Sequence, residues 1–98
     1  QLAPQEWLLA YQSRFGRQQW LQPDTESVLA QWARSGVGSV DVICPAFATD
    51  CLETLEEIGA QNAERFCAQG GRALRLIPCL NDSREHARAL HALIHRNL

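Results

Sequence analysis

The sequence predicts an α/β fold of three layers, in which helices flank both faces of a parallel sheet and the elements follow the order β-α-β-α-β-α. Three short apolar runs alternate with stretches of helical periodicity, and a glycine, a proline or a capping residue stands at each change. Strands that are joined through helices form right-handed crossovers, and such strands lie parallel in one sheet.

The first third of the chain predicts one strand and one helix. Residues 7–12 form an apolar run before Gly16, which is typical of a buried strand. Thr25 with Glu26 then marks the start of a helix over residues 27–34. Two glycines soon after that stretch are typical of a helix C-terminus.

The middle of the chain predicts a second strand and the longest helix. Residues 39–44 are rich in β-branched side chains, and Pro45 ends this strand because it has no N–H to donate to a ladder. A helix is expected from Asp50 to about Gln69, where Gly70 and the glycine after it terminate the helical pattern.

The end of the chain predicts the third strand and the third helix. Residues 72–77 alternate enough between polar and apolar side chains to form a strand. Asn81, Asp82 and Ser83 form a cluster of helix-capping residues, and the last helix runs from there through His95.

Composition places the chain among small globular domains. It has 98 residues, 46% of them apolar, and no apolar run approaches the roughly 20 residues of a membrane span. The formal charge is −2 and all nine basic residues are arginines, so no cationic stripe is available and nucleic acid is not an expected partner. The first residues lack the features of a signal peptide and do not begin with methionine, so we expect a soluble piece of a longer protein.

The four cysteines predict free thiols. Cys44, Cys51, Cys67 and Cys79 are separated by 7, 16 and 12 positions, which matches neither a zinc site nor a redox dithiol. Free thiols indicate a reducing compartment, and hence a cytoplasmic protein. Packing as small apolar side chains is favoured over a metal role, and an iron–sulfur cluster is not expected.

A ridge of carboxylates is the most informative feature of the long predicted helix. At about 100° per residue, four acids fall within an arc of about 60°: Asp50, Glu53, Glu57 and Glu64. Carboxylates this close repel one another, which inside a cleft favours capture of a proton or a cation. Periodicity alone favours an ordinary solvated helix face, but the ridge begins at the carboxyl end of a strand, where open parallel sheets bind ligands.

Three motifs stand out along the chain. They are Gln12-Ser13-Arg14-Phe15-Gly16, Trp20-Leu21-x-Pro23-x-Thr25 and Cys44-Pro45-x-Phe47-x-x-Asp50-Cys51-Leu52-Glu53-Thr54-Leu55-Glu56-Glu57-Ile58. In this order they closely resemble the carboxy-terminal part of bacterial ferrochelatases. Ferrochelatases are class II chelatases, lyases of two Rossmann-like domains that insert ferrous iron into protoporphyrin IX in the last step of the route to haem. The resemblance implies a Rossmann-like, chelatase-like fold, with ferrous iron and protoporphyrin IX as substrates.

The resemblance also implies roles for individual residues. Glu53 matches the active-site glutamate of the family and is expected to handle both protons and metal. Glu57 matches the next acid along the helix, and Asp50 lies at the entrance of the ridge, so all three carboxylates are expected metal ligands. Trp20 matches the tryptophan that lines the porphyrin cleft. The other residues expected to shape the cleft are Ser13, Arg14, Phe15 and Pro45.

The chain departs from the family pattern in two ways. The catalytic histidine of the family lies in the preceding domain, and none of the three histidines of this chain matches it. Gln61 stands where some members carry another acid. We therefore expect a carboxy-terminal fragment that lacks its amino-terminal domain and is inactive alone. Two alternatives stay open: a metal- or tetrapyrrole-binding module without turnover, and a structural half-domain whose sheet faces a missing partner domain. An uncovered apolar surface also predicts that the isolated piece associates with itself.

Overall fold

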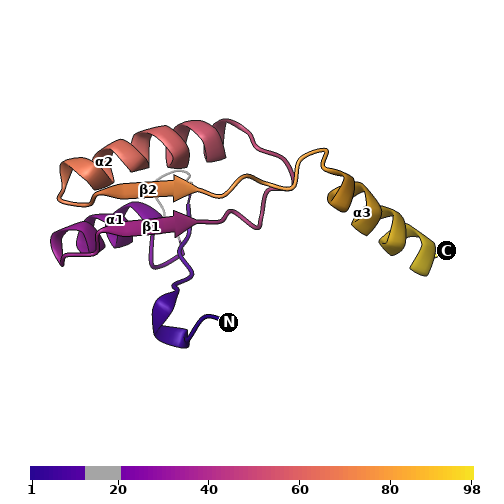
Figure 1. The fold of residues 1–98 in the computed structure, drawn as a ribbon, viewed down its shortest axis with the longest axis horizontal. Helices are drawn as coiled ribbons and strands as arrows, with labels where there is room; N and C mark the ends of the chain where they lie inside the picture. The colour runs from indigo at the N-terminus through magenta and orange to yellow at the C-terminus, as the bar shows by residue number, and fades with distance from the viewer. Residues whose placement is uncertain (13–20) are drawn as a thin grey trace.

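The computed structural model describes residues 1–12 and 21–98, and it confirms the predicted α/β class (Figure 1). Within this part of the chain, no helix is both long and apolar enough to cross a membrane. The elements in chain order are a 3₁₀ turn η1 (Pro4–Glu6), α1 (Thr25–Arg34), β1 (Ser39–Val42), a π-helix η2 (Glu53–Asn62), α2 (Ala63–Ala68), β2 (Ala73–Leu76) and α3 (Arg84–Arg96).

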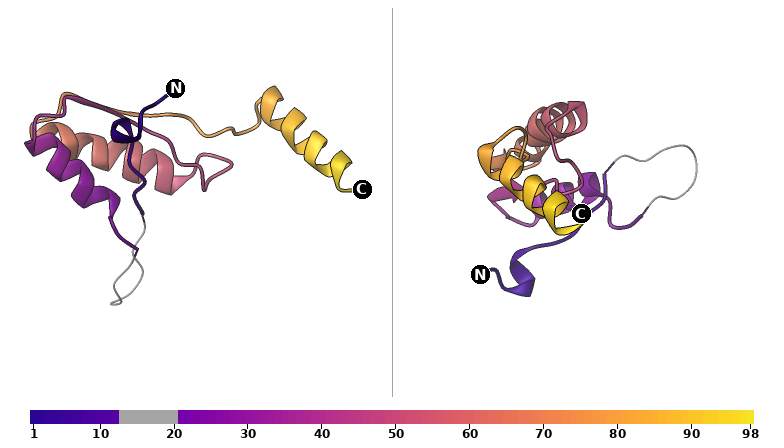
Figure 2. Two further views of the ribbon diagram at one scale, coloured as in Figure 1. Left: turned by 90° about the horizontal axis from the view of Figure 1, so that it is seen from below. Right: turned by 90° about the vertical axis from the view of Figure 1, so that its right-hand side faces the viewer.

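The sheet of the described residues has two strands rather than the three expected. β1 and β2 are parallel, with Ser39 opposite Ala73 and Val42 opposite Leu76. Both α1 and the continuous η2–α2 segment lie on one face of this sheet, and α3 extends away from the body (Figure 2). The described residues therefore form two layers, where the sequence predicted three.

Alternation along the strands agrees with a sheet that is covered on one face. Val40 is buried and Leu74 is half-buried, and both pack in the core beneath the helices. Asp41 and Arg75, which are paired in the register, are exposed and form an ion pair of 2.6 Å. Strands that are buried on both faces lack such polar positions, so the one-sided packing is consistent with the sequence of the strands.

The core lies between α1, β1 and α2. Leu29 and Ala33 of α1 pack with Val40 and with Phe66, whose side chain is fully buried. Gly71 lies directly against the Phe66 ring, so closely that a Cβ atom at this position would overlap it. Gly71 is therefore required by close packing against this ring.

The first helix begins two residues earlier than the sequence predicted. Asp24 is its N-cap, and the carboxylate accepts a hydrogen bond of 3.0 Å from the backbone N–H of Ser27. The helix ends at Arg34, and Gly36 follows in the left-handed region with φ of +99°. A glycine adopts this conformation without steric cost, which confirms the predicted end of the helix.

The strand predicted over residues 7–12 is wrong. The hydrogen bonds of Tyr11 go to the turn before α1, because its N–H donates to the carbonyl of Pro23 and its carbonyl accepts from Thr25, each at 2.9 Å. This single bridge does not extend into a ladder with β1. The apolar side chains of the run instead line a largely apolar cavity of about 650 Å³ beside α1 and β1, so their pattern marked contact with apolar surface and not strand pairing.

The long helix predicted from Asp50 consists of two kinds of helix. η2 is a π-helix, with hydrogen bonds from residue i to i+5 and more residues in each turn than an α-helix has. α2 continues it to Ala68, and Gly70 follows with φ of +115°. Asp50 lies before the first turn. The ridge calculated at 100° per residue therefore does not describe Glu53–Asn62.

Replacing Phe66 with alanine is expected to destabilise the chain by about 3–5 kcal/mol, because a fully buried aromatic side chain leaves a cavity. The matched control is Leu55→Ala, at a leucine that is 57% exposed on η2, where a change within about 0.5 kcal/mol is expected. Urea unfolding of both variants measures the difference. Equal free energies of unfolding for the two variants would show that the core does not center on Phe66.

Candidate functional site

The candidate site lies at the carboxyl ends of β1 and β2. The segment after β1 leads into η2, and the segment after β2 leads into α3. Because the strands are parallel, both segments leave the sheet at the same edge (Figure 1). Ile77 continues the pairing slightly past β2, because its N–H donates to the carbonyl of Val42 at 2.8 Å. Residues that follow the two strands are thereby brought side by side.

Asp50 and Asn81 tie these two segments together. The backbone N–H of Asp50 donates to Oδ1 of Asn81 at 2.7 Å, and Nδ2 of Asn81 donates to Oδ2 of Asp50 at 2.9 Å. The N–H of Asn81 also donates to the carbonyl of Ala48 at 2.9 Å. Asn81 has φ of +53°, in the left-handed region that asparagine tolerates better than most residues. The start of η2 is thereby fixed against the loop after β2.

The carboxylate of Asp50 is fully engaged in this junction. Besides Asn81, it accepts hydrogen bonds from the Thr54 hydroxyl at 2.9 Å and from the N–H of Cys79 at 3.2 Å. The Asn81 side chain is the main cause that lowers the pKa of Asp50, with Cys79 and Thr54 adding to it. Asp50 is therefore ionised at neutral pH. Its role as a metal ligand stays a prediction, and coordination would require these hydrogen bonds to be exchanged.

Glu53 is the first residue of η2 and is half-buried. The Cys51 side chain and the backbone N–H of Glu53 itself donate to its carboxylate, and these bonds lower the pKa of Glu53. The sequence argument expected repulsion within the ridge to favour capture of either a proton or a cation. Hydrogen-bond donors act in the opposite direction here, so Glu53 is held in the charged form that attracts a cation.

Glu57 follows on the same helix and is held by a residue from a distant segment. Nε2 of Gln12 donates to Oε2 of Glu57 at 2.7 Å and to the backbone carbonyl of Glu53 at 2.7 Å. The carbonyl of Glu57 accepts a further bond of 2.9 Å from Nδ2 of Asn62. Side-chain amides thus supply extra donors to two carbonyls of the π-helix.

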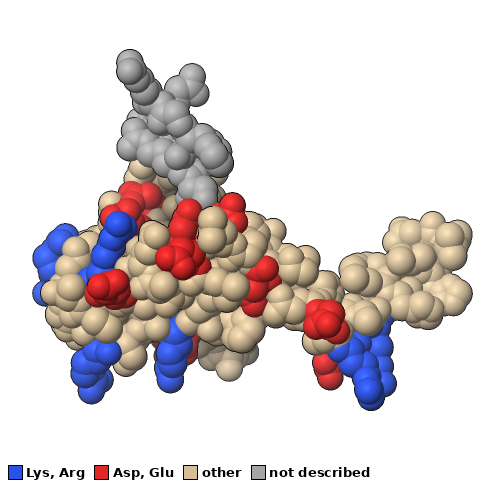
Figure 3. Space-filling view, turned by 90° about the horizontal axis from the view of Figure 1, so that it is seen from above, with Lys and Arg blue, Asp and Glu red and all other residues tan. Residues whose placement is uncertain are grey.

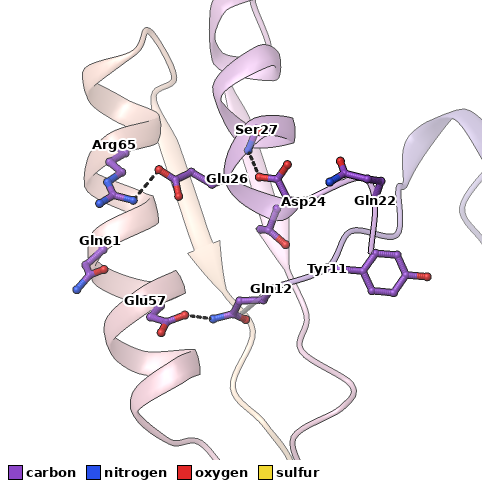
Figure 4. A pocket seen from close by; sticks show the side chains of 10 residues that line it. Tyr11, Gln12, Gln22, Asp24, Glu26, Ser27, Glu57, Gln61 and Arg65 are labelled. Carbon is purple, nitrogen blue, oxygen red and sulfur yellow. Dashed lines mark hydrogen bonds and ion pairs between the residues drawn. The ribbon is translucent and has the colours of Figure 1, made fainter. Parts of the chain in front are cut away.

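Glu57 and Gln12 border a polar cavity of about 470 Å³ between η2 and the start of α1 (Figure 4). Three acids, Asp24, Glu26 and Glu57, line this cavity against one arginine, Arg65, which is paired with Glu26 at 2.9 Å. Local electrostatics at this cavity therefore favour a cation over an anion. On the face of the body shown in Figure 3, acidic side chains are spread along the upper surface, and most arginines lie along the margins and below α3. The residues that line the cavity are Tyr11, Gln12, Gln22, Asp24, Thr25, Glu26, Ser27, Glu57, Gln61 and Arg65.

The other described site residues predicted from the sequence lie outside the group formed by Asp50, Glu53 and Glu57. Glu64 is exposed on α2, and Pro45 lies in the turn after β1, where it lines the apolar cavity with Phe47. Among the described residues, no three His, Cys, Asp or Glu side chains converge closely enough to hold a metal ion. Four predicted cleft residues lie outside the described part of the chain: Ser13, Arg14, Phe15 and Trp20.

All four cysteines are free thiols. Burial is the main cause that raises the pKa of Cys44, and it raises the pKa of Cys79 to about 11, with the nearby Asp50 carboxylate contributing to both shifts. These two thiols are therefore protonated at neutral pH. The thiolate is the form that binds metals and attacks disulfides, so neither thiol is poised for that chemistry.

Two residues of the site, Gln12 and Asn81, were not predicted as functional from the sequence. Gln12 opens the first of the three motifs, but no local spacing connects it with Glu57, which is 45 residues away. Asn81 was predicted only as one member of the capping cluster before α3. Within that cluster Ser83 is the cap, because its hydroxyl accepts from the N–H of His86 at 3.2 Å, and Asn81 bonds to Asp50.

Comparison with known proteins gives consistent matches. Residues 1–98 match the profile of the family described as Ferrochelatase. A ferrochelatase of Nitrosococcus oceani is 50% identical over 93 residues, which cover 95% of this chain and 25% of that protein. One from Stenotrophomonas maltophilia is 56% identical over 92 residues, covering 94% and 28%. Ferrochelatase 1 of Shewanella oneidensis is 54% identical over 89 residues, covering 91% and 27%.

The chain therefore spans about a quarter of the length of the curated relatives it matches. No solved structure matches it.

Replacing Asp50 with asparagine is expected to destabilise the 98-residue chain at neutral pH. The Asp50 carboxylate accepts from three donors, and an amide has only one oxygen to accept with. Its NH₂ group would therefore face one of these donors, and that hydrogen bond would be lost. Because the pKa of Asp50 is lower in the folded chain, its contribution is present at neutral pH and is lost as the pH falls through that lowered pKa. The difference between wild type and Asp50→Asn should therefore shrink from about pH 4 downward.

Urea unfolding across this pH range measures the effect, and Glu64→Gln serves as the control because that side chain is exposed on α2. A loss no larger than that of Glu64→Gln at pH 7 would contradict the role of Asp50 at the junction.

Proposed function

The chain belongs to the ferrochelatase family, because the family profile matches all of its residues, and on this premise we propose that the longer protein inserts ferrous iron into protoporphyrin IX to form protohaem in haem biosynthesis. The observation that carries this proposal is the position of Glu53 and Glu57 on a π-helix that starts at the carboxyl edge of the sheet. Such helices often occur at functional sites. The reaction would make the protein a lyase, and we expect it in the cytoplasm.

Glu53 is the proposed acid/base and metal-handling residue. In iron insertion two pyrrole N–H bonds break, bonds form between iron and the pyrrole nitrogens, and two protons leave. The lowered pKa keeps Glu53 ionised, so it can attract a divalent cation and accept a departing proton, which then passes to water. A low pKa limits its strength as a base, and attraction of the cation is the larger part of its proposed role.

Glu57 is the proposed second iron ligand along the helix, and Asp50 contributes mainly by fixing the start of the helix. Carboxylates bind a divalent ion without the strong grip of thiolates, so the ion can be released to the macrocycle. Gln61 lines the same polar cavity as Glu57. An amide oxygen there can replace a water of the arriving ion without adding charge. Stepwise loss of water along these residues is the proposed route of iron.

The porphyrin is proposed to bind beside the start of η2. Pro45 borders the apolar cavity after β1, and apolar walls of this kind suit the flat face of a macrocycle. Ser13, Arg14, Phe15 and Trp20 are proposed to complete the cleft, together with an amino-terminal domain that supplies the family's catalytic histidine. The raised pKa of Cys44 and of Cys79 supports a protein without an iron–sulfur cluster at these positions.

In the full-length protein, Glu53→Gln is expected to lower kcat for iron insertion by about 10²–10⁴-fold, the usual effect of losing a positioned acid or base. Glu64→Gln removes the same charge from an exposed position on α2 and should leave kcat close to that of wild type. Anaerobic assays with ferrous iron and protoporphyrin IX compare the two. Equal small losses would remove Glu53 from the reaction.

The 98-residue chain alone is expected to insert no iron above the uncatalysed background. None of its three histidines matches the family's catalytic histidine, and the described histidines lie on α3, which extends away from the body (Figure 1). Mixing the purified chain with ferrous iron and protoporphyrin IX tests this. Turnover by the chain would show that its own residues are sufficient and that the proposed division of roles is incorrect.

A further inference from the structure

Gln12 joins two parts of the chain that the proposed reaction needs close together. Its side chain has two N–H donors on one nitrogen, and both are used, one on the Glu57 carboxylate and one on the Glu53 carbonyl, each at 2.7 Å. The bond to Glu57 goes to a side-chain carboxylate, and hydrogen bonds to carboxylates are stronger than those between neutral groups. The amide therefore holds a carboxylate and the backbone of the π-helix at the same time.

These bonds connect the helix with the segment that precedes the predicted porphyrin cleft. Gln12 is half-buried and borders the polar cavity, where Figure 4 shows its amide directed at Glu57. Ser13, Arg14 and Phe15 follow it directly in the sequence. A displacement of Gln12 would thus alter the position of Glu57 and of the backbone at Glu53.

We propose that Gln12 is a positioning residue for iron insertion, which fixes the Glu57 carboxylate and the first turn of η2 in the orientation that receives the ion. This inference rests on the proposed function. Glu57 has three rotatable bonds in its side chain, and ordering such a side chain has an entropic cost. Gln12 orders it in advance, as outer hydrogen-bond partners order metal ligands generally.

The test compares variants of Gln12 in the full-length protein, with ferrous iron and protoporphyrin IX varied separately under anaerobic conditions. Gln12→Leu removes both donors and is expected to lower kcat/KM for iron by about 10–100-fold, while KM for porphyrin stays close to that of wild type. Gln31→Leu is the matched control, because Gln31 is exposed on α1 and borders neither the polar nor the apolar cavity. It should retain the wild-type constants.

Gln12→Glu separates positioning from space filling. Glutamate has nearly the same shape, but it cannot donate when ionised and it places a second carboxylate against Glu57. A positioning role predicts that Gln12→Glu is at least as impaired with iron as Gln12→Leu. A role limited to packing predicts activity close to wild type. Gln12→Asn, which keeps the amide but shortens it, provides a milder variant if Gln12→Leu does not fold, as judged by its urea midpoint.

A double variant tests whether Gln12 acts through Glu57. Gln12→Leu combined with Glu57→Gln is expected to lose clearly less activity than the product of the two single losses, because residues that act as a unit are not additive. Losses that multiply in the double variant would overturn the proposed role of Gln12, and so would a wild-type kcat/KM for iron in Gln12→Leu. Either result would leave the proposed function unaffected. Absence of iron insertion in the wild-type full-length protein would overturn the proposed function, and the role of Gln12 with it.

Discussion

The paired hydrogen bonds between Asp50 and Asn81 hold together the two chain segments that leave the sheet. η2 begins three residues after Asp50, and its second residue, Thr54, donates to the same carboxylate. The direction of η2, and with it the positions of Glu53 and Glu57, depends on this junction. Hydrogen bonds to an ionised acceptor are stronger than neutral ones, which explains why a charged residue serves at the point where two loops meet.

Local signals predicted much of the fold. The glycines after α1 and α2 ended both helices where expected, and the segments of β1 and β2 were located to within a few residues. Asp41 and Arg75, which form an exposed ion pair, are charged positions that indicate a sheet with one exposed face. The strand prediction rested on β-branched residues and did not take these charges into account. The run 7–12 could not be assigned in this way, because an apolar run shows that a segment contacts apolar surface and does not show which hydrogen bonds it makes.

The site was predicted less completely than the fold. Its location at the carboxyl edge of the strands followed from topology, and Glu53 and Glu57 are indeed on one helix there. The π-helix was not predicted, because the residue pattern was read at 100° per residue, and the donor that Gln12 supplies to one of its carbonyls comes from a segment 41 residues away. Asp50 was grouped with the helix by spacing alone. Its actual partners, including Asn81, are close only after β1 and β2 have paired.

X-ray absorption spectroscopy of the full-length protein, loaded with ferrous iron in the absence of porphyrin, most directly tests whether these carboxylates handle the metal. Oxygen and sulfur ligands give distinct first-shell distances. The expected result is a first shell that contains oxygen or nitrogen and no sulfur, and that is lost or altered in the Glu53→Gln variant. A sulfur shell, or a spectrum unchanged by Glu53→Gln, would contradict the proposed site.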